Sequence, residues 1–277
     1  MIKAEILLDS VSADTGARLT TAILTYPRFI HSEVMTHRMF SRNAASSRAI
    51  PVKKVIEEVR NNPAMPVFWG KNQSGMQAKE EVSGLDLNTV QTAWLAAAED
   101  AIKHAEVMMK HGLHKQIANR ILEPWFHMRT IVSATDWDNF FALRCHPDAQ
   151  PEFKVLAQIL REEFSKSKPT VKFAGEWHLP YIKAEEAGLD LEVLKKLSTA
   201  RCCRISYLSL DGTNSDVNKD TNLHDSLVQS GHMSPLEHAA EASEESKFFG
   251  NFYGWKQYRK FIPNEHNFAK LQGVANV

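Results

Sequence analysis

The strongest periodic pattern in the chain lies between Thr89 and Lys110. Apolar side chains recur there every three or four residues, the spacing that places them on one face of a helix. The members of this stripe are Val90, Trp94, Ala97, Ala101, Ala105 and Met108. Asn88 stands where an N-cap belongs, and Gly112 follows the last turn. The pattern therefore predicts one long amphipathic helix over 89–110.

Two segments near the N-terminus are typical of strands. Residues 2–8 and 19–26 are rich in β-branched and aromatic side chains, and Pro27 ends the second segment. From Phe29 to Arg48 the apolar spacing becomes helical, and Pro51 ends or bends that element.

Further helices complete the predicted fold. They are expected over about 115–122, 137–143, 153–164, 189–200 and 221–230. Because strands and helices do not alternate regularly, the sequence predicts an α+β fold with a mixed or antiparallel sheet and several long helices. Residues 166–180 are predicted to link a segment 1–165 to a segment 181–277, the two forming one intertwined domain.

Composition narrows the class of protein. The 277 residues carry 33 Lys and Arg against 33 Asp and Glu, whereas proteins that bind DNA or RNA usually have a basic excess. We therefore expect no nucleic-acid partner and a local pocket for any phosphate. No apolar run reaches the length of a membrane span, the N-terminus lacks a signal-peptide pattern, and three cysteines suggest no disulfide framework. A cytoplasmic protein without a membrane partner is expected.

The segment Met35–Pro51, MTHRMFSRNAASSRAIP, concentrates cations without carboxylates. On a helix, His37 would share a face with Ser41, and Arg38 with Arg42, because each pair is four residues apart. Arg48 follows two serines, and guanidinium and hydroxyl groups together are suited to a phosphate. The alternative is a solvated basic face of a surface helix.

Two other arginines stand inside apolar runs. Arg144 lies between Leu143 and Cys145, and Arg120 precedes Ile121. Each is either buried and paired, for Arg144 with Asp148, or directed into a pocket. The adjacent pair Cys145–His146 is expected to be structural, because neighbouring residues on a helix point about a hundred degrees apart.

The segment GHMSPLEHA, Gly231 to Ala239, allows two interpretations. Ser234 and Glu237 have the spacing of a capping box. His232 and His238 could bind a metal, but the spacing lacks a zinc signature, and we expect no metal site. The chain also lacks G-x-G-x-x-G and Walker motifs, so a bound nucleotide would be held by side chains.

Taken together, these segments resemble the flavin-dependent thymidylate synthase (ThyX) family. The family signature Arg-His-Arg, seven residues, then Ser is similar to Thr36-His37-Arg38 followed by Ser46, Ser47 and Arg48. Its downstream Asn-Phe-x-x-Leu-Arg and Ala-Gln-x-Glu blocks are similar to Asn139–Arg144 and Ala149–Glu152. Its Ala-Arg-x-Ser-Tyr and Gly-His-x-[Ser/Thr]-Pro-Phe-Glu-His elements are similar to Cys203–Tyr207 and Gly231–His238.

The order of these blocks differs from the family pattern, where the Ser-Tyr and Gly-His elements come first. The chain therefore resembles a permuted or rearranged member. A second, degenerate echo of the arginine motif lies in residues 251–265, at Trp255, Arg259, Asn264 and Glu265.

The resemblance implies reductive methylation of dUMP to dTMP, with FAD bound in a homotetramer and with NADPH and methylenetetrahydrofolate as cosubstrates. The positions that match flavin contacts are His37, Arg38, Ser41, Asn43, Asn139, Ser206, His232, Ser234 and Glu237. The positions that match the nucleotide site are Ser46, Ser47, Arg48, Arg120 and Arg144. Arg144 matches the catalytic arginine that polarises the pyrimidine, and a cation in an apolar setting can stabilise negative charge on that ring.

Five positions depart from the family pattern: Glu33 for glutamine, Thr36 for arginine, Ala44 for glutamate, Ala49 for tyrosine and Asp148 for histidine. These departures leave two alternatives. One is methyl or hydroxymethyl transfer to another pyrimidine nucleotide such as dCMP, or hydroxymethylation of dUMP. The other is a nucleotide-binding relative without catalysis.

Overall fold

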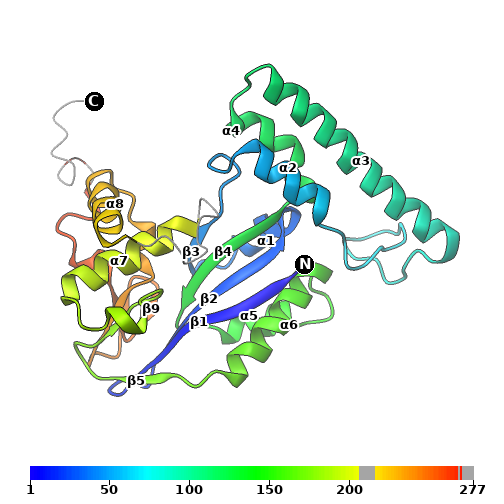
Figure 1. Cartoon of the computed structure of the whole chain (residues 1–277). Helices are drawn as coiled ribbons and strands as arrows, with labels where there is room; N and C mark the ends of the chain where they lie inside the picture. The colour runs from blue at the N-terminus through cyan, green and yellow to red at the C-terminus, as the bar shows by residue number, and fades with distance from the viewer. Residues whose placement is uncertain (206–215, 268, 270–277) are drawn as a thin grey trace.

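A five-stranded sheet forms the centre of the protein (Figure 1). Its strands lie in the spatial order β3 (Ser41–Ala44), β4 (His127–Ala134), β2 (Arg18–Pro27), β1 (Lys3–Ser12) and β5 (Thr170–Lys172). Neighbouring strands are antiparallel, except that β1 and β5 are parallel. The computed structural model describes residues 1–205, 216–267 and 269. This mixed sheet with its covering helices confirms the α+β prediction.

The central strand β2 is buried on both faces. Ala22, Leu24 and Tyr26 belong to the largest hydrophobic core, whereas Leu19 and Ile23 belong to two smaller clusters. Successive side chains of a strand point to opposite faces, so the almost continuous apolar run over 19–26 is that of a strand covered on both sides.

Helices from the first two thirds of the chain share one hydrophobic core with the face of the sheet that carries Ala22. They are α1 (His31–Val34), α2 (Val52–Asn61), α3 (Gly84–Lys110), α4 (Lys115–Ala118), α5 (Asp138–Arg144) and α6 (Pro151–Lys166), with 3-10 turns η1 (Arg28–Ile30) and η2 (Asn119–Trp125). Phe153 and Leu160 of α6 are fully buried in this core.

The C-terminal part covers the other face. It contains α7 (Leu191–Arg204), α8 (Val217–Gln229), and the turns η3 (Ala184–Glu186), η5 (Ser234–Glu237) and η6 (Tyr258–Phe261). Its strands form the sheet β10 (Trp255–Gln257), β7 (Ala240–Ala242), β6 (Trp177–His178) and the hairpin β8 (Phe248–Phe249), β9 (Phe252–Tyr253). The residues predicted as a linker, 166–180, carry β5 and β6, and the division of the chain into segments stays a prediction.

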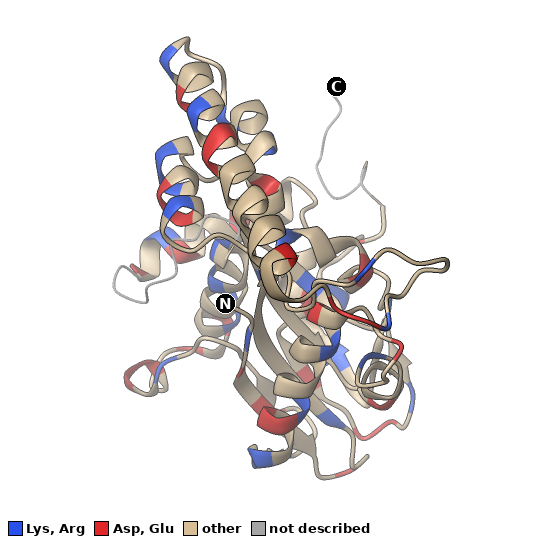
Figure 2. Ribbon diagram, turned by 90° about the vertical axis from the view of Figure 1, so that its right-hand side faces the viewer, with Lys and Arg blue, Asp and Glu red and all other residues tan. Residues whose placement is uncertain are grey.

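The long helix is present but begins earlier than expected. Ser83, not Asn88, is the N-cap of α3, and the buried side chains are Ala98, Ile102 and Ala105, whereas Ala97 is exposed. Acidic and basic residues are interspersed along its outer side (Figure 2), where Asp100 pairs with Lys103 at 2.9 Å.

The helix predicted from Phe29 to Arg48 is wrong beyond Val34. Ser41–Ala44 instead form the edge strand β3, which pairs with Ser133–Thr130 of β4. Arg42 stabilises the turn before this strand by donating to the carbonyl oxygens of Met35 (3.0 Å) and His37 (2.6 Å). The hydrogen bonds of the sheet edge thus override the local helical spacing, and the predicted pairs on a shared helix face do not exist.

The helix predicted over 115–122 changes at Asn119 into the 3-10 turn η2, which contains Pro124. The Asn119 amide donates to the carbonyl oxygens of Ser47 (2.6 Å) and Ile50 (2.9 Å). Tertiary hydrogen bonds therefore fix this turn beside the serine-rich segment.

Candidate functional site

The first group of predicted site residues meets at Arg144, the last residue of α5. Its Nε donates to Nε2 of His37 at 2.8 Å, and its Nη2 donates to the hydroxyl of Thr36 at 3.1 Å. The guanidinium carbon lies 4.5 Å from the centroid of the Phe153 ring. The arginine is therefore held at three points, and its remaining N–H groups can serve a ligand.

Burial sets the charge of this pair. It lowers the pKa of His37 to about 4, with Arg144 and Arg42 acting in the same direction. His37 is consequently neutral at physiological pH and can accept the arginine N–H. Within the described residues no carboxylate bonds to Arg144, so the expected alternative of an ion pair with Asp148 is wrong. Asp148 lies instead 3.6 Å from His146 and is largely exposed.

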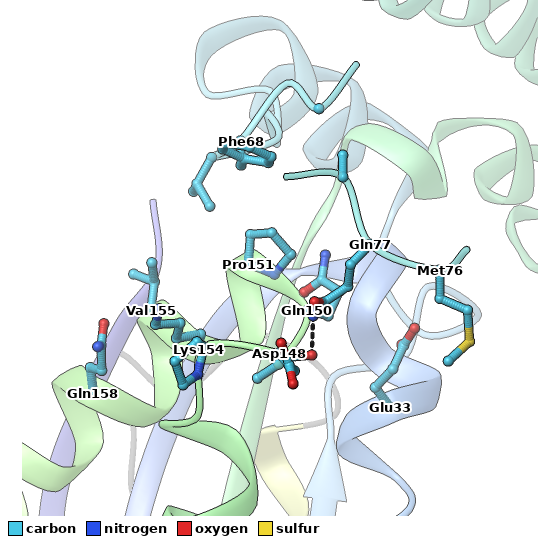
Figure 3. Close-up of a pocket in the computed structure, with 15 residues that line it drawn as sticks. Glu33, Phe68, Met76, Gln77, Asp148, Gln150, Pro151, Lys154, Val155 and Gln158 are labelled. Atoms are coloured by element: carbon cyan, nitrogen blue, oxygen red, sulfur yellow. Dashed lines mark hydrogen bonds between the residues drawn. The ribbon is translucent and has the colours of Figure 1, made fainter. Parts of the chain in front are cut away.

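A cavity of about 1030 Å³ opens beside this group. It lies between Glu33 of α1, the loop around Phe68 and Met76, and the first turns of α6 (Figure 3). Pro147–Ala149, which follow Arg144 closely in the chain, form part of its wall. Arg144 does not line the cavity, whereas Glu33, whose charge partly offsets the lowering of the Arg144 pKa by burial, does.

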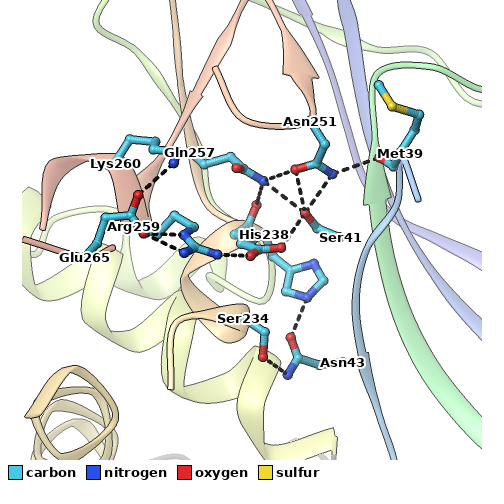
Figure 4. A network of polar contacts seen from close by, with 11 residues as sticks. Met39, Ser41, Asn43, Ser234, His238, Asn251, Gln257, Arg259, Lys260 and Glu265 are labelled. Atoms are coloured by element: carbon cyan, nitrogen blue, oxygen red, sulfur yellow. Dashed lines mark hydrogen bonds and ion pairs between the residues drawn. The ribbon is translucent and has the colours of Figure 1, made fainter. Parts of the chain in front are cut away.

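The second group joins β3 to the C-terminal part (Figure 4). The hydroxyl of Ser41, only 1% exposed, donates to Glu237 at 2.9 Å, and Asn43 lies 3.1 Å from the hydroxyl of Ser234. Arg259 pairs with Glu237 and also with Glu265. Four predicted flavin positions, 41, 43, 234 and 237, are thus brought together although they are nearly 200 residues apart.

The capping box predicted for Ser234 and Glu237 is wrong. The turn that begins at Ser234 is 3-10, its N-cap is Met233, and no side chain caps it. Both side chains are used for tertiary contacts, because Glu237 faces Ser41 and Arg259, and Ser234 faces Asn43.

The third group surrounds the serine pair. The hydroxyl of Ser47 donates to Glu123 at 2.7 Å, and Arg120 donates to the same carboxylate oxygen at 2.9 Å. Arg120 is therefore paired at the surface with Glu123. Ser46 is half-buried, and Arg48 is exposed. In the part of the chain that the structure covers, Arg48 makes no hydrogen bond or ion pair.

Four predicted positions stay outside these groups. Arg38 and Asn139 are exposed, and exposed His232 bonds to the hydroxyl of Ser230 at 2.7 Å. Ser206 lies outside the described residues. Cys145 is half-buried, and burial raises the pKa of its thiol, which keeps it protonated.

The structure also adds polar residues around the second group, of which Gln257 and Asn251 were not indicated by the sequence as site residues and His238 was indicated only as a candidate metal ligand. Gln257 donates to Ser41 at 2.9 Å, Asn251 donates to the carbonyl oxygen of Met39 at 2.8 Å, and fully buried His238 lies 2.9 Å from both Ser133 and Asn43. Arg259 and Glu265 belong to the echo over 251–265, which was the only sequence signal for this segment.

Across residues 1–205 and 216–267, no group of three or more His, Cys, Asp or Glu side chains could hold a metal ion. None of the helices in the same ranges is long and apolar enough to cross a membrane.

Solved structures with a similar fold include a UMP/dUMP methylase, PolB, from Streptomyces cacaoi. Its complex with 5-Br dUMP is 17% identical, with a TM-score of 0.50, and the match covers 60% of this chain and 90% of that chain. The complex with 5-Br UMP is 19% identical, with a TM-score of 0.48 and coverage of 60% and 89%. At this identity the first similarity shows a shared fold.

Sequence comparisons identify the family. No curated protein matches the chain. The family profile described as thymidylate synthase complementing protein, Thy1, matches residues 15–170 and thus includes the Thr36-His37-Arg38 motif and the Asn139–Arg144 block. The elements at 203–207 and 231–238 lie outside this match, and their permuted order stays a prediction. Because the match spans more than half of the chain, this protein belongs to the Thy1 (ThyX) family.

Proposed function

We propose that the protein is a flavin-dependent thymidylate synthase that methylates dUMP to dTMP, with methylenetetrahydrofolate as carbon donor and NADPH as reductant. Membership of the Thy1 family supports this reaction class. The observation that carries the proposal is the Arg144–His37 contact, which joins the two arginine motifs of the family resemblance at 2.8 Å.

Arg144 is proposed to polarise the pyrimidine. Its guanidinium is desolvated enough to lower its pKa, and neutral His37 and the Phe153 ring fix its orientation without neutralising its charge. A fixed cation in such a setting stabilises negative charge that develops on a bound ring. His37 acts in this scheme by holding the guanidinium.

FAD is the proposed cofactor, and when bound it would supply the hydride. Its proposed contacts are His37, Arg38, Ser41, Asn43, Asn139, Ser206, His232, Ser234 and Glu237. Ser41, Asn43, Ser234 and Glu237 lie together, and the Asn43 amide beside the exposed Ser234 hydroxyl offers donors and acceptors that suit the polar edge of a flavin ring. Buried Ser41 would contribute by orienting Glu237, to which it donates at 2.9 Å.

The nucleotide phosphate is proposed to lie at Ser46, Ser47, Arg48 and Arg120. Arg48 is exposed and has no carboxylate partner among the described residues, which leaves its guanidinium available for a phosphate. Arg120 donates to Glu123 at 2.9 Å, which fixes its guanidinium and leaves its other N–H groups available for the phosphate. By analogy with the family we also propose a homotetramer in the cytoplasm.

A second candidate function is methyl or hydroxymethyl transfer to dCMP. Glu33 lines the cavity, and a carboxylate accepts a hydrogen bond from the amino group of cytosine, which uracil lacks. A nucleotide-binding protein without catalysis remains the third candidate.

One experiment separates these functions. The protein is incubated with FAD, NADPH, methylenetetrahydrofolate and either dUMP or dCMP, and the product is weighed by mass spectrometry. A methylated dUMP supports the proposal, a modified dCMP supports the second candidate, and flavin binding without product supports the third. Full turnover by Arg144→Ala would contradict the role given to Arg144.

A further inference from the structure

A chain of buried hydrogen bonds begins at Asn43 and crosses the sheet to Ser10. His238 Nε2 lies 2.9 Å from the Asn43 amide, and His238 Nδ1 lies 2.9 Å from the hydroxyl of Ser133. Ser133 then meets Thr21 at 2.6 Å. The hydroxyl of Thr21 also lies 2.9 Å from His178 Nε2, and His178 Nδ1 lies 2.8 Å from the hydroxyl of Ser10.

Every residue of this hydrogen-bond chain beyond Asn43 is buried. Ser10, Thr21, Ser133, His178 and His238 are all 0% exposed. Burial lowers the pKa of both histidines to about 3, so each carries a single ring proton at physiological pH. A neutral imidazole that donates from one nitrogen must accept at the other.

The hydroxyl groups extend this rule along the chain. Ser133 and Thr21 each have one proton to donate, and a buried hydroxyl proton without an acceptor costs free energy. In all five hydrogen bonds the donors must therefore point the same way along the series, and only two arrangements of the protons give every hydroxyl and imidazole both a donor and an acceptor. In one, both histidines carry the proton on Nδ1; in the other, both carry it on Nε2.

The surroundings of Asn43 select between the two arrangements. With its nitrogen directed at His238 Nε2 (2.9 Å), the amide also donates to the carbonyl oxygen of Ser234 at 3.1 Å, and its oxygen accepts from the Ser234 hydroxyl at 3.1 Å. The opposite orientation gives only one bond to His238 and one to the Ser234 hydroxyl. The first orientation satisfies more polar atoms.

We infer that His238 and His178 are positioning residues whose shared Nδ1–H tautomer holds the Asn43 amide with its nitrogen turned inward. The carbonyl oxygen of Asn43 accepts from Ser234 with one lone pair and offers the other to a ligand. The half-exposed end of Asn43 then offers an acceptor, so the group that binds there is an N–H or O–H donor. The identity of that ligand as flavin rests on the proposed function, whereas the tautomers do not.

The test uses the full chain labelled with ¹⁵N-histidine, without flavin or nucleotide, in long-range ¹H–¹⁵N correlation spectra near pH 7. Wild-type protein is expected to show protonated Nδ1 and unprotonated Nε2 on both His178 and His238. Asn43→Asp places an acceptor opposite His238, and both histidines should change to the Nε2–H form. The matched control Asn88→Asp, on exposed α3, should change neither.

A second variant keeps the inference testable if Asn43→Asp is poorly folded. Ser133→Ala alone interrupts the hydrogen-bond chain without touching Asn43, and His238 should stay in the Nδ1–H form that the Asn43 nitrogen requires. Added to Asn43→Asp, it should let His238 change tautomer while His178 does not follow. Protonated Nε2 on His238 in the wild type, or a His178 that ignores the change at His238 while Ser133 is intact, would overturn the inference. Because no flavin is present, absence of dTMP formation in the separate assay bears on the proposed function alone.

Discussion

Arg144 donates from Nε to Nε2 of His37 at 2.8 Å, across 107 residues of sequence. The contact is possible because burial lowers the pKa of His37 to about 4 and keeps the imidazole neutral. A cation and a neutral histidine thus form a unit to which no carboxylate of the described residues is ion-paired, although the charge of Glu33 acts on it from farther away.

Replacing Arg144 should remove turnover while the fold is kept. Arg144→Ala is expected to lower the rate of dTMP formation by about 100- to 1000-fold, the usual effect of removing one electrostatic stabiliser of a transition state. Arg144→Lys should recover little, because an ammonium cannot reproduce the fork that contacts both His37 and Thr36. Exposed Arg161→Ala is the matched control, and an equal loss in that variant would contradict the assignment.

The phosphate role of Arg48 can be measured as nucleotide affinity. Arg48→Ala should raise the Kd for dUMP by about 10- to 100-fold, since a hydrogen bond to a charged group contributes about 1.5–3 kcal/mol. The effect should shrink for the nucleoside, which has no phosphate. Exposed Lys53→Ala, close by on α2, should change the Kd little in either titration.

The stability of the protein should fall as the solution is acidified. Burial lowers the pKa of His31, His37 and His127 to about 4 from the usual 6.5. Between these values the unfolded chain binds more protons than the folded one, so the free energy of unfolding decreases from about pH 6.5 toward pH 4.

Urea midpoints across that pH range check this expectation. Each such histidine contributes a slope of at most about 1.4 kcal/mol per pH unit, and His31→Gln should remove up to one such contribution. Exposed His111→Gln is the matched control for the effect of the substitution itself. A midpoint that does not move between pH 6.5 and 4.5 would contradict the neutral state of the buried histidines.

The contacts of Glu237 with Ser41 of β3 and with Arg259 should stabilise the attachment of the C-terminal part to β3. Glu237→Ala removes the acceptor of both Ser41 and Arg259, and it is expected to lower the free energy of unfolding by about 2–3 kcal/mol. Glu245→Ala, which breaks the exposed pair with Lys247, should cost less than about 1 kcal/mol. Equal losses in the two variants would argue against a structural role for Glu237.

Much of the fold could be predicted from local sequence. The strands β1 and β2 lie over the predicted segments, and α3, α5, α6, α7 and α8 coincide closely with expected helices. These elements have strong periodic patterns, and burial of their apolar faces agrees with local preference. The family was also recognisable from short motifs, as the profile match over 15–170 confirms.

The wrong predictions share one cause: residues distant in sequence compete with local partners for the same hydrogen-bonding groups. Ser41–Ala44 lie in a segment whose apolar spacing is helical, but their backbone groups form hydrogen bonds with the edge of β4 instead. Ser234 and Glu237 have capping-box spacing. Their side chains instead bind distant residues, Ser234 to Asn43 and Glu237 to Ser41 and Arg259, so they do not cap the turn.

The sequence by itself determined where the main strands and helices form and which motifs the chain carries, because apolar periodicity and motif spacing act over a few residues. Only the tertiary structure decided that Arg144 meets His37 rather than Asp148, and that Asn43 is held through His238 by a buried chain ending at Ser10. Such contacts depend on which polar groups remain unpaired when the core closes, and no local pattern contains that information.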